Sequence, residues 1–322
     1  MKEIKVTKND SGQRIDRFLS KSFPLGQGQI CKLARKNCIK LNGKKCKPDT
    51  HIAENDIIKL FIPDEMLIPK AKSDPDDFTG VSDKIDIVYE DENILLADKP
   101  VGMVVHEDES SDSDTLINRI KSYLYHKGEY HPENELSFAP ALCNRIDRNT
   151  CGIVIAAKNA ESLRILNQKI RDRELTKLYL CIACGKVTPD SATLTAYLEK
   201  NSDTNTVKIS DKKTKSNLTI KTKYKVIAYN GENSLLKVDL LTGRTHQIRA
   251  HLAYIGHALL GDGKYGNNKL NKKYGFKYQA LCSYELQFKF TTDAGCLSYL
   301  DGKCFKAKAP DFVKMFSGNI KL

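Results

Sequence analysis

The sequence predicts an α+β protein made of two unequal parts. Six short apolar segments between residues 87 and 238 have the composition of β-strands. A helical pattern at residues 160–171 interrupts them, and a basic region, residues 1–62, precedes them. Because strands and helices do not alternate regularly, the larger part is better described as α+β than as a series of βαβ units.

Two short amphipathic helices and a hairpin are expected in the N-terminal region. Apolar side chains recur at helical spacing in residues 15–19 and again in residues 30–34. Asn42-Gly43, between two short segments that contain Lys, is typical of a tight hairpin. The second helix and the hairpin would present one basic face together. Its residues are Lys32, Arg35, Lys36, Lys40, Lys44 and Lys45.

Much of the positive charge of the chain lies in this region. Residues 1–62 carry 14 Lys and Arg against 6 Asp and Glu, a net +8 out of the total of +12. An anionic partner fits this charge, and nucleic acid and an acidic membrane surface are both candidates. Lys-rich surfaces also keep proteins soluble, so the charge alone does not decide between these explanations.

The order of elements in the N-terminal region is more specific than its charge. The segments that matter are Gly12-Gln13-Arg14-Ile15-Asp16-Arg17-Phe18-Leu19, Ile30-x-x-Leu33-x-Arg35 and Ile39-x-Leu41-Asn42-Gly43. Together they resemble the small RNA-binding domain shared by a small-subunit ribosomal protein and tyrosyl-tRNA synthetases. The resemblance covers residues 12–62 and implies that the basic face binds structured RNA through its shape and phosphates.

Residues 63–84 have the composition of a linker, with three prolines and six acidic residues. We therefore predict a small RNA-binding domain at residues 1–62, a linker at residues 63–84 and a larger domain at residues 85–322.

The larger domain begins where strand-like segments begin. Residues 160–171 form a predicted helix, with Leu163, Leu166 and Ile170 on one face and Asn159 as its N-cap. The polar residues 201–217 are expected to form an exposed turn or a flexible hairpin. The strand-like segments are 87–89, 94–97, 153–156, 179–182, 224–227 and 235–238.

Composition excludes several classes of protein. No stretch approaches the roughly 18 apolar residues of a membrane span, and residues 1–5 lack the apolar run of a signal peptide. The ten cysteines lie in apolar surroundings and suggest reduced thiols, so we expect a cytoplasmic protein. Cys181 and Cys184 have zinc-like spacing, but no second such pair exists, and no metal site is predicted.

The segment Asn144 to Gly152 is the first candidate for chemistry. Asp147 lies between Arg145 and Arg148, directly before an apolar strand. Such an acid suits either a catalytic carboxylate or an ion-pair cluster that fixes a loop, and this segment alone leaves both explanations open.

A second segment, residues 241–252, favours catalysis. Thr245 is placed to cap a helix whose buried face carries Ile248 and Leu252. Arg249 lies near that face and needs an anionic partner, for which Asp147 is the simplest candidate. The alternative is a solvated phosphate-binding face made of Arg244, His246, Arg249 and His251.

Five motifs in order identify a family resemblance. They are Lys99-Pro100-x-Gly102-Met103-Val104-Val105-His106, Arg145-Ile146-Asp147-Arg148-x-Thr150-x-Gly152, Tyr179-Leu180, Gly243-Arg244-Thr245-His246-Gln247-Ile248-Arg249-Ala250-His251-Leu252 and Leu260-Gly261-Asp262-x-x-Tyr265-Gly266. Together they resemble the RluA family of pseudouridine synthases, over residues 85–300. With the RNA-binding domain they resemble its ribosomal RNA branch. The chain departs from the family at Asn144, where His is usual, and at Cys151, where Ser is usual.

The resemblance implies the fold and the reaction. The larger domain is expected to have the mixed, largely antiparallel sheet of this family and to isomerise uridine to pseudouridine without a metal or other cofactor. It implies that the catalytic residues are Asp147, Tyr179 and Arg249, and that the substrate-binding residues are Arg145, Arg244, His246 and Gln247. For a strand Tyr such as Tyr179, simple core packing is the alternative.

Structured RNA, most plausibly large-subunit ribosomal RNA, is the implied partner. A tRNA synthase, a non-catalytic ribosome-assembly factor and an RNA glycosidase or nuclease that uses Asp147 remain alternatives. We expect a monomer with no obligate protein partner.

Overall fold

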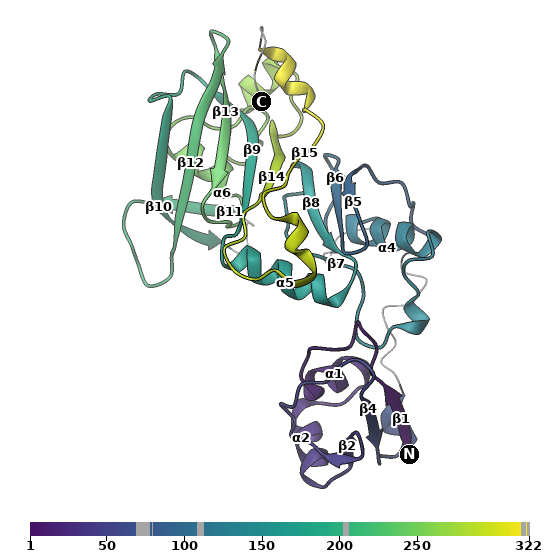
Figure 1. Ribbon diagram of the computed structural model, residues 1–322. Helices are drawn as coiled ribbons and strands as arrows, with labels where there is room; N and C mark the ends of the chain where they lie inside the picture. Colours follow the sequence, from purple (N-terminus) through teal and green to yellow (C-terminus); the bar gives the residue numbers. More distant parts are fainter. Residues whose placement is uncertain (69–77, 79, 108–112, 202–205, 317–319, 321–322) are drawn as a thin grey trace.

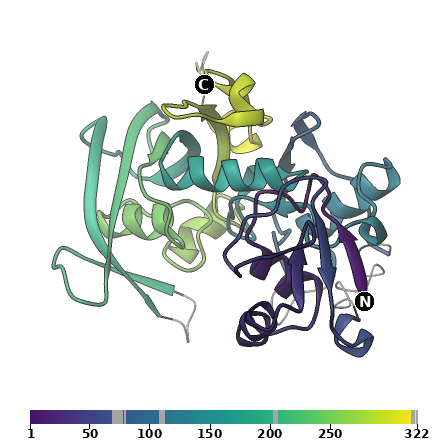
Figure 2. The same ribbon diagram turned by 60° about the horizontal axis from the view of Figure 1, so that its bottom comes forward.

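The computed structural model describes residues 1–68, 78, 80–107, 113–201, 206–316 and 320, and it contains two β-sheets (Figure 1). A four-stranded sheet forms in the N-terminal unit and an eleven-stranded sheet in the larger domain. Figures 1 and 2 show the N-terminal unit at one end of the larger domain. Of the predicted linker, residues 69–77 and 79 lie outside the described residues.

The N-terminal unit has the predicted helices and hairpin. Both central residues of the hairpin turn have positive φ, 50° at Asn42 and 77° at Gly43, as a tight hairpin requires. The strand order is β1-β4-β2-β3, and every pairing is antiparallel. The elements are β1 (Lys2–Lys5), α1 (Ile15–Ser22), α2 (Gln27–Arg35), β2 (Ile39–Leu41), β3 (Lys44–Lys45), β4 (Ile57–Leu60) and the 3-10 helix η1 (Asp64–Leu67).

A compact apolar core supports this unit. Phe18, Ile30 and Ile58 are fully buried in it, and Leu67 packs in the same cluster. The N-terminal core therefore continues past residue 62. Of the six basic residues predicted to bind RNA, five are exposed, and Lys40 is half-buried over the ring of Phe61.

The larger domain contains a mixed, largely antiparallel sheet, as predicted. Its strand order is β11-β10-β12-β13-β9-β14-β8-β6-β5, with β15 beside β14 and β7 beside β8. Among the strand pairs of the described residues, only β8–β14 is parallel. The strands are β5 (Ile87–Glu90), β6 (Ile94–Lys99), β7 (Ala141–Leu142), β8 (Cys151–Ala157), β9 (Leu175–Cys184), β10 (Ser191–Asn201), β11 (Thr206–Ser210), β12 (Leu218–Tyr229), β13 (Asn233–Leu240), β14 (Leu281–Phe288) and β15 (Cys304–Lys306).

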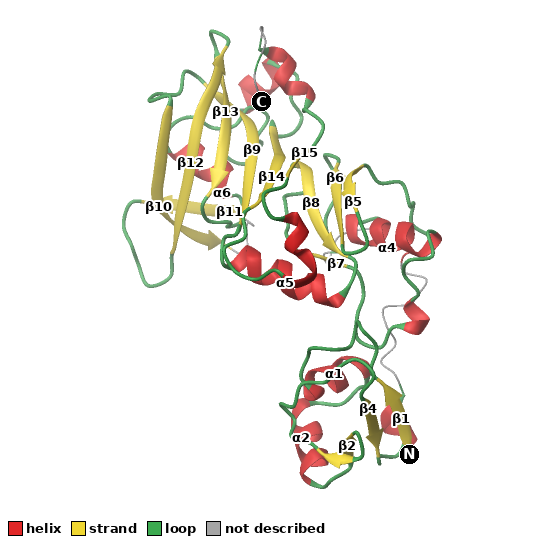
Figure 3. Ribbon diagram, viewed as in Figure 1, coloured by secondary structure: helices red, strands yellow, loops and turns green. Residues whose placement is uncertain are grey.

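Helices cover this sheet, and α4 and α5 lie on the side toward the N-terminal unit (Figure 3). Asn159 caps α5 by accepting from the backbone N–H of Ser162 at 2.8 Å, as predicted. Leu166 of α5 and Leu252 of α6 belong to different apolar clusters of the sheet. The helices are α4 (Leu116–His126), α5 (Ala160–Arg171), α6 (Gln247–Tyr254) and α7 (Asn268–Lys273), with 3-10 helices η2 (Pro132–Asn134), η3 (Gly295–Leu300) and η4 (Asp311–Met315).

The parallel pair β8–β14 comes unusually close at Gly152. Its φ is +105°, and a Cβ atom there would lie 2.2 Å from the carbonyl oxygen of Ser283. Only glycine fits such a position. This contact fixes the start of β8, directly after the loop that carries Asp147.

Candidate active site

The loop between β7 and β8 carries Asp147. Its beginning is held against β8 by Asn144, whose side-chain oxygen accepts from the backbone N–H of Ile155 at 2.8 Å. Its end is a turn in which the N–H of Thr150 donates to the carbonyl of Asp147 at 3.0 Å. Asn144, the residue that departs from the family pattern, therefore anchors the start of this loop to β8.

Arg249 joins Asp147 to a second carboxylate. Its Nη1 donates to Oδ2 of Asp147 at 2.9 Å, which confirms the predicted pair. Its Nε and Nη2 donate to the two carboxylate oxygens of Asp262, at 2.7 and 3.0 Å. The side chain of Asp262 is fully buried, and that of Arg249 is 7% exposed. The side chain of Asp147 is 26% exposed and remains accessible to a ligand.

Two acids keep the guanidinium charged in this buried position. Although burial works against the charge, hydrogen bonds and the charges of Asp262 and Asp147 raise the pKa of Arg249. Burial likewise opposes ionisation of Asp262, but Arg249 and two backbone N–H groups lower its pKa below the ordinary value. Asp262 therefore acts as a fixed anion that orients Arg249 toward Asp147.

Aromatic side chains surround this ion pair. The guanidinium carbon of Arg249 lies 5.3 Å from the ring centroid of Tyr265, and the hydroxyl of Tyr265 is 2.9 Å from Nδ1 of His246. Nε2 of His246 is 3.9 Å from Oδ2 of Asp147. Burial lowers the pKa of His246 despite the nearby Asp147, so the imidazole is mainly neutral near pH 7.

One prediction about the start of α6 is wrong. Thr245 does not cap the helix, because His246 occupies the N-cap position in the left-handed conformation, with φ 51°. Gln247, which was predicted to bind substrate, has its side chain bonded within the protein. It is buried, its side-chain oxygen accepts from Thr242 and from the N–H of Arg244, and its side-chain nitrogen donates to Lys221 and Thr222. All its hydrogen-bonding positions are used inside the protein.

The proposed phosphate-binding face is also contradicted by burial. Arg249 and His251 are buried, and His251 contacts the hydroxyl of Thr222 at 2.9 Å. Arg244 is exposed, as is Arg145 in the loop of Asp147. Both Arg side chains therefore remain accessible to a ligand.

Tyr179 lies on β9 within the core cluster that also contains Ile146, the neighbour of Asp147. Burial, with a smaller contribution from the Asp147 charge, raises the pKa of Tyr179 to about 12, although a hydrogen bond with Ser283 lowers it. The phenol therefore keeps its proton near pH 7. The structure thus brings Asp147, Arg249, His246 and Tyr179 into one region.

Lys99 is a buried cation that sequence reasoning did not assign to the site. Its ammonium donates to the carbonyls of Pro100, Met103 and Arg148, at 2.9, 2.8 and 2.9 Å. Burial lowers its pKa to about 8. Because one acceptor adjoins Asp147, Lys99 ties the turn at residues 100–103 to the Asp147 loop. The family motifs named above contain Lys99, Asp262 and Tyr265. These motifs could therefore have identified all three as residues of the site.

Neither a metal site nor a membrane span is found within the described ranges. No three His, Cys, Asp or Glu side chains of those residues are grouped to hold a metal ion. None of the helices there has both the length and the apolar character needed to cross a bilayer.

Comparisons with known proteins agree on one family. Residues 93–254 match the family described as RNA pseudouridylate synthase. An uncharacterized RNA pseudouridine synthase of Mycoplasma genitalium is 35% identical over 88% of this chain and 88% of its own length. The ribosomal large subunit pseudouridine synthase D of Borreliella burgdorferi is 32% identical over 81% of this chain and 78% of its own.

Solved structures agree on the fold. Human RNA pseudouridylate synthase domain containing 1 matches with a TM-score of 0.56 at 20% identity, covering 74% of this chain and 91% of its own. Human RNA pseudouridylate synthase domain containing 4 matches with a TM-score of 0.56 at 18% identity, covering 71% of this chain and 90% of its own. With its Asp147–Arg249 pair on this fold, and with relatives of this identity over most of its length, the chain belongs to the RluA-type family of RNA pseudouridine synthases.

Proposed function

We propose that this enzyme converts specific uridines of large-subunit ribosomal RNA to pseudouridine, with Asp147 as the reacting carboxylate. The observation that carries the proposal is the partly exposed Asp147 held by Arg249, whose other nitrogens are occupied by buried Asp262. A carboxylate with one side fixed and one side accessible is suited to react with a substrate. The names of several relatives and the basic face of the N-terminal unit support ribosomal RNA as the substrate.

The reaction is an isomerisation that leaves the composition of the RNA unchanged. The bond between the sugar carbon and uracil nitrogen 1 breaks, and a bond from the same sugar carbon to uracil carbon 5 forms. The proton on carbon 5 leaves, and nitrogen 1 gains a proton. Asp147 would attack either the sugar carbon or uracil carbon 6. No electrons are gained or lost, so the proposed chemistry needs no redox cofactor.

Tyr179 is proposed to contact the uracil ring and to receive the carbon 5 proton. Its burial beside Asp147 supports the contact. Its raised pKa makes the neutral phenol the resting form, so it would first have to lose its own proton to act as a base.

Arg145 and Arg244 are proposed to contact RNA around the target base. A target base inside structured RNA has to leave its stack, which costs a few kcal/mol. Arg145, which is exposed and lies two residues before Asp147, would fill the vacated space. Arg145→Ala is expected to slow turnover on a folded substrate more than on an unstructured one, and equal losses on both would count against this role.

Tritium release tests the proposal directly. Large-subunit ribosomal RNA labelled at uracil carbon 5 is incubated with the wild type and with Asp147→Asn, and any modified position is mapped afterwards. Release by the wild type alone is expected. Release of tritium from tRNA but not from ribosomal RNA would mean that tRNA is the substrate. The appearance of free uracil would indicate a glycosidase. Binding without release from either RNA would favour an assembly factor. We further propose that the enzyme acts in the cytoplasm as a monomer.

A further inference from the structure

A polar junction joins the N-terminal unit to the larger domain. The hydroxyl of Ser137 donates to the buried Asp10 carboxylate at 2.6 Å and accepts from the side chain of Gln13 at 2.8 Å. Arg164 of α5 donates to the carbonyl of Ser11 at 3.0 Å. The contacts of Ser137 hold the loop before α1 against residues 135–139, the segment that leads into β7 and the Asp147 loop, and Arg164 holds the same loop against α5.

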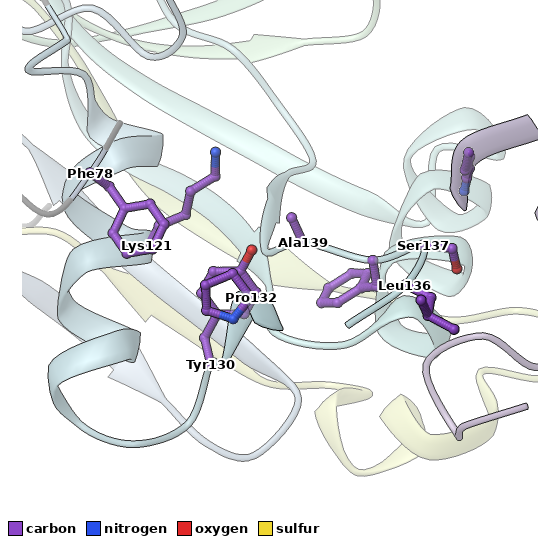
Figure 4. A pocket seen from close by; sticks show the side chains of 9 residues that line it. Phe78, Lys121, Tyr130, Pro132, Leu136, Ser137 and Ala139 are labelled. Atoms are coloured by element: carbon purple, nitrogen blue, oxygen red, sulfur yellow. The ribbon is translucent and has the colours of Figure 1, made fainter. Parts of the chain in front are cut away.

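A cavity of about 180 Å³ lies at this junction. Figure 4 shows the side chains of Phe78, Tyr130 and Pro132 gathered on one side of it and those of Leu136 and Ser137 on the other. An apolar cavity of roughly 150 Å³ is known to hold benzene, so this one is large enough for a single flat ring. Its lining is mainly aromatic and apolar, which suits a stacked base.

Positive charge converges on the same place from both units. Lys21 of α1 lines the cavity, and so does Lys121 of α4. Although the side chain of Lys21 is largely exposed, partial burial lowers its pKa, and the neighbouring charges of Arg164 and Arg17 lower it further. Asp10 opposes this effect on Lys21, and its carboxylate oxygens already accept from Thr7 and Ser137. Two further acids, Glu133 and Glu135, act on Tyr130 at the other side of the cavity. Like charges that crowd together in this way are relieved when an anion binds beside them.

We propose that the junction cavity binds one unpaired nucleotide of the RNA substrate, with its base among the aromatic side chains and its phosphate beside Lys21. A flat ring next to a phosphate is the chemistry that an aromatic pocket with flanking cations recognises. The bound nucleotide would contact both units, and thereby set the position of the RNA relative to Asp147. This inference rests on the proposed function for the identity of the ligand as RNA.

Binding of a fluorescent single-stranded oligouridylate, measured at several salt concentrations, tests the phosphate contact. Lys21 is exposed, so Lys21→Glu should fold normally. It is expected to weaken binding about tenfold and to reduce the slope of log affinity against log salt by roughly 0.7, the value for one phosphate contact on a single strand. Lys314→Glu in η4 makes the same change of charge at an exposed site elsewhere, and should change affinity less than about twofold. Equal effects of the two variants would overturn the proposal.

Photo-crosslinking tests the base contact. An oligouridylate that contains 4-thiouridine is irradiated with the full-length protein, and the modified peptides are mapped. Crosslinks within residues 130–139 are expected in the wild type and in the control Lys314→Glu, and should be lost in Lys21→Glu. The absence of crosslinks in residues 130–139 of the wild type would overturn the proposal.

A cavity-filling variant separates the base from the phosphate. Ala139→Leu is expected to weaken binding while leaving the salt slope unchanged, with thermal melting as the check on folding. An unchanged affinity in a folded variant would overturn the base contact. All three measurements need no turnover, so a failure to form pseudouridine would leave their outcomes interpretable.

Discussion

Arg249 donates one hydrogen bond to Asp147 and two to Asp262, so that a single guanidinium orients two carboxylates of different accessibility. The bidentate pair with Asp262 is fully enclosed and leaves Arg249 little freedom to turn. The single bond to Asp147 leaves that carboxylate partly exposed. The position of Asp147 is thus determined, through Arg249, by Asp262, which is fully enclosed by the protein.

Asp262→Asn is therefore expected to slow the reaction without weakening RNA binding. The amide keeps an oxygen for the backbone N–H groups of Lys264 and Tyr265 but loses the charge that holds Arg249. We expect kcat to fall at least tenfold with KM within about twofold, and unfolding free energy to fall by about 3 kcal/mol, as for a broken buried pair. Asp311→Asn, which removes an exposed partner of Lys314, is the control. A rise in KM at constant kcat would mean that Asp262 contributes to RNA binding and does not position Asp147.

Lys99→Met should loosen the loop of Asp147. The substitution keeps the apolar length of the side chain but removes three hydrogen bonds to carbonyls, which then stay buried without this partner. We expect a loss of stability of about 3 kcal/mol, a lower kcat and faster amide exchange at residues 147–150. Unchanged exchange at those residues together with normal activity would contradict the positioning role.

Local patterns in the sequence predicted local structure well. The Asn42-Gly43 turn and the Asn159 cap were confirmed because each depends on a few neighbouring residues. The six apolar segments were confirmed as strands because strongly β-forming runs were bounded by polar residues. Helix α4 was missed, although Thr115 caps it by accepting from the N–H of Asn118 and its apolar residues recur every four positions. That signal was present in the sequence.

The polar run 201–217 was expected to form an exposed turn or a flexible hairpin, and within it β11 pairs antiparallel with the preceding strand β10. Features set by distant contacts were not predictable in the same way. Gln247 was predicted from its motif to bind substrate, and the motif did not indicate that its side chain hydrogen-bonds Lys221 and Thr222 of β12. Asp262 could be assigned to Arg249 only once the fold had brought the loop after α6 next to it.

His251 predicts an acid-sensitive stability. Burial lowers its pKa to about 4, below the ordinary value of 6.5, so the folded state favours neutral His251. Between pH 6.5 and 4 the unfolded chain binds more protons at this residue, and stability is lost as pH falls through that window. The loss should be on the order of 2 kcal/mol. Urea unfolding of the wild type and His251→Gln at pH 7 and pH 4.5 measures it. We expect a smaller difference between the two pH values in the variant, and equal differences would contradict the assignment.

Tyr179 provides a test of how the carbon 5 proton leaves. Because its pKa is raised to about 12, only a minute fraction of the phenol is ionised near pH 7. If the phenolate is the base, the single-turnover rate of the wild type should rise about tenfold per pH unit between pH 7 and 9. Tyr179→Phe keeps the ring and should bind RNA within about threefold of the wild type, while its single-turnover rate falls 100-fold or more and loses this pH dependence. A flat profile in the wild type would mean that another group removes the proton, and that the burial of Tyr179 serves to hold the uracil ring in place.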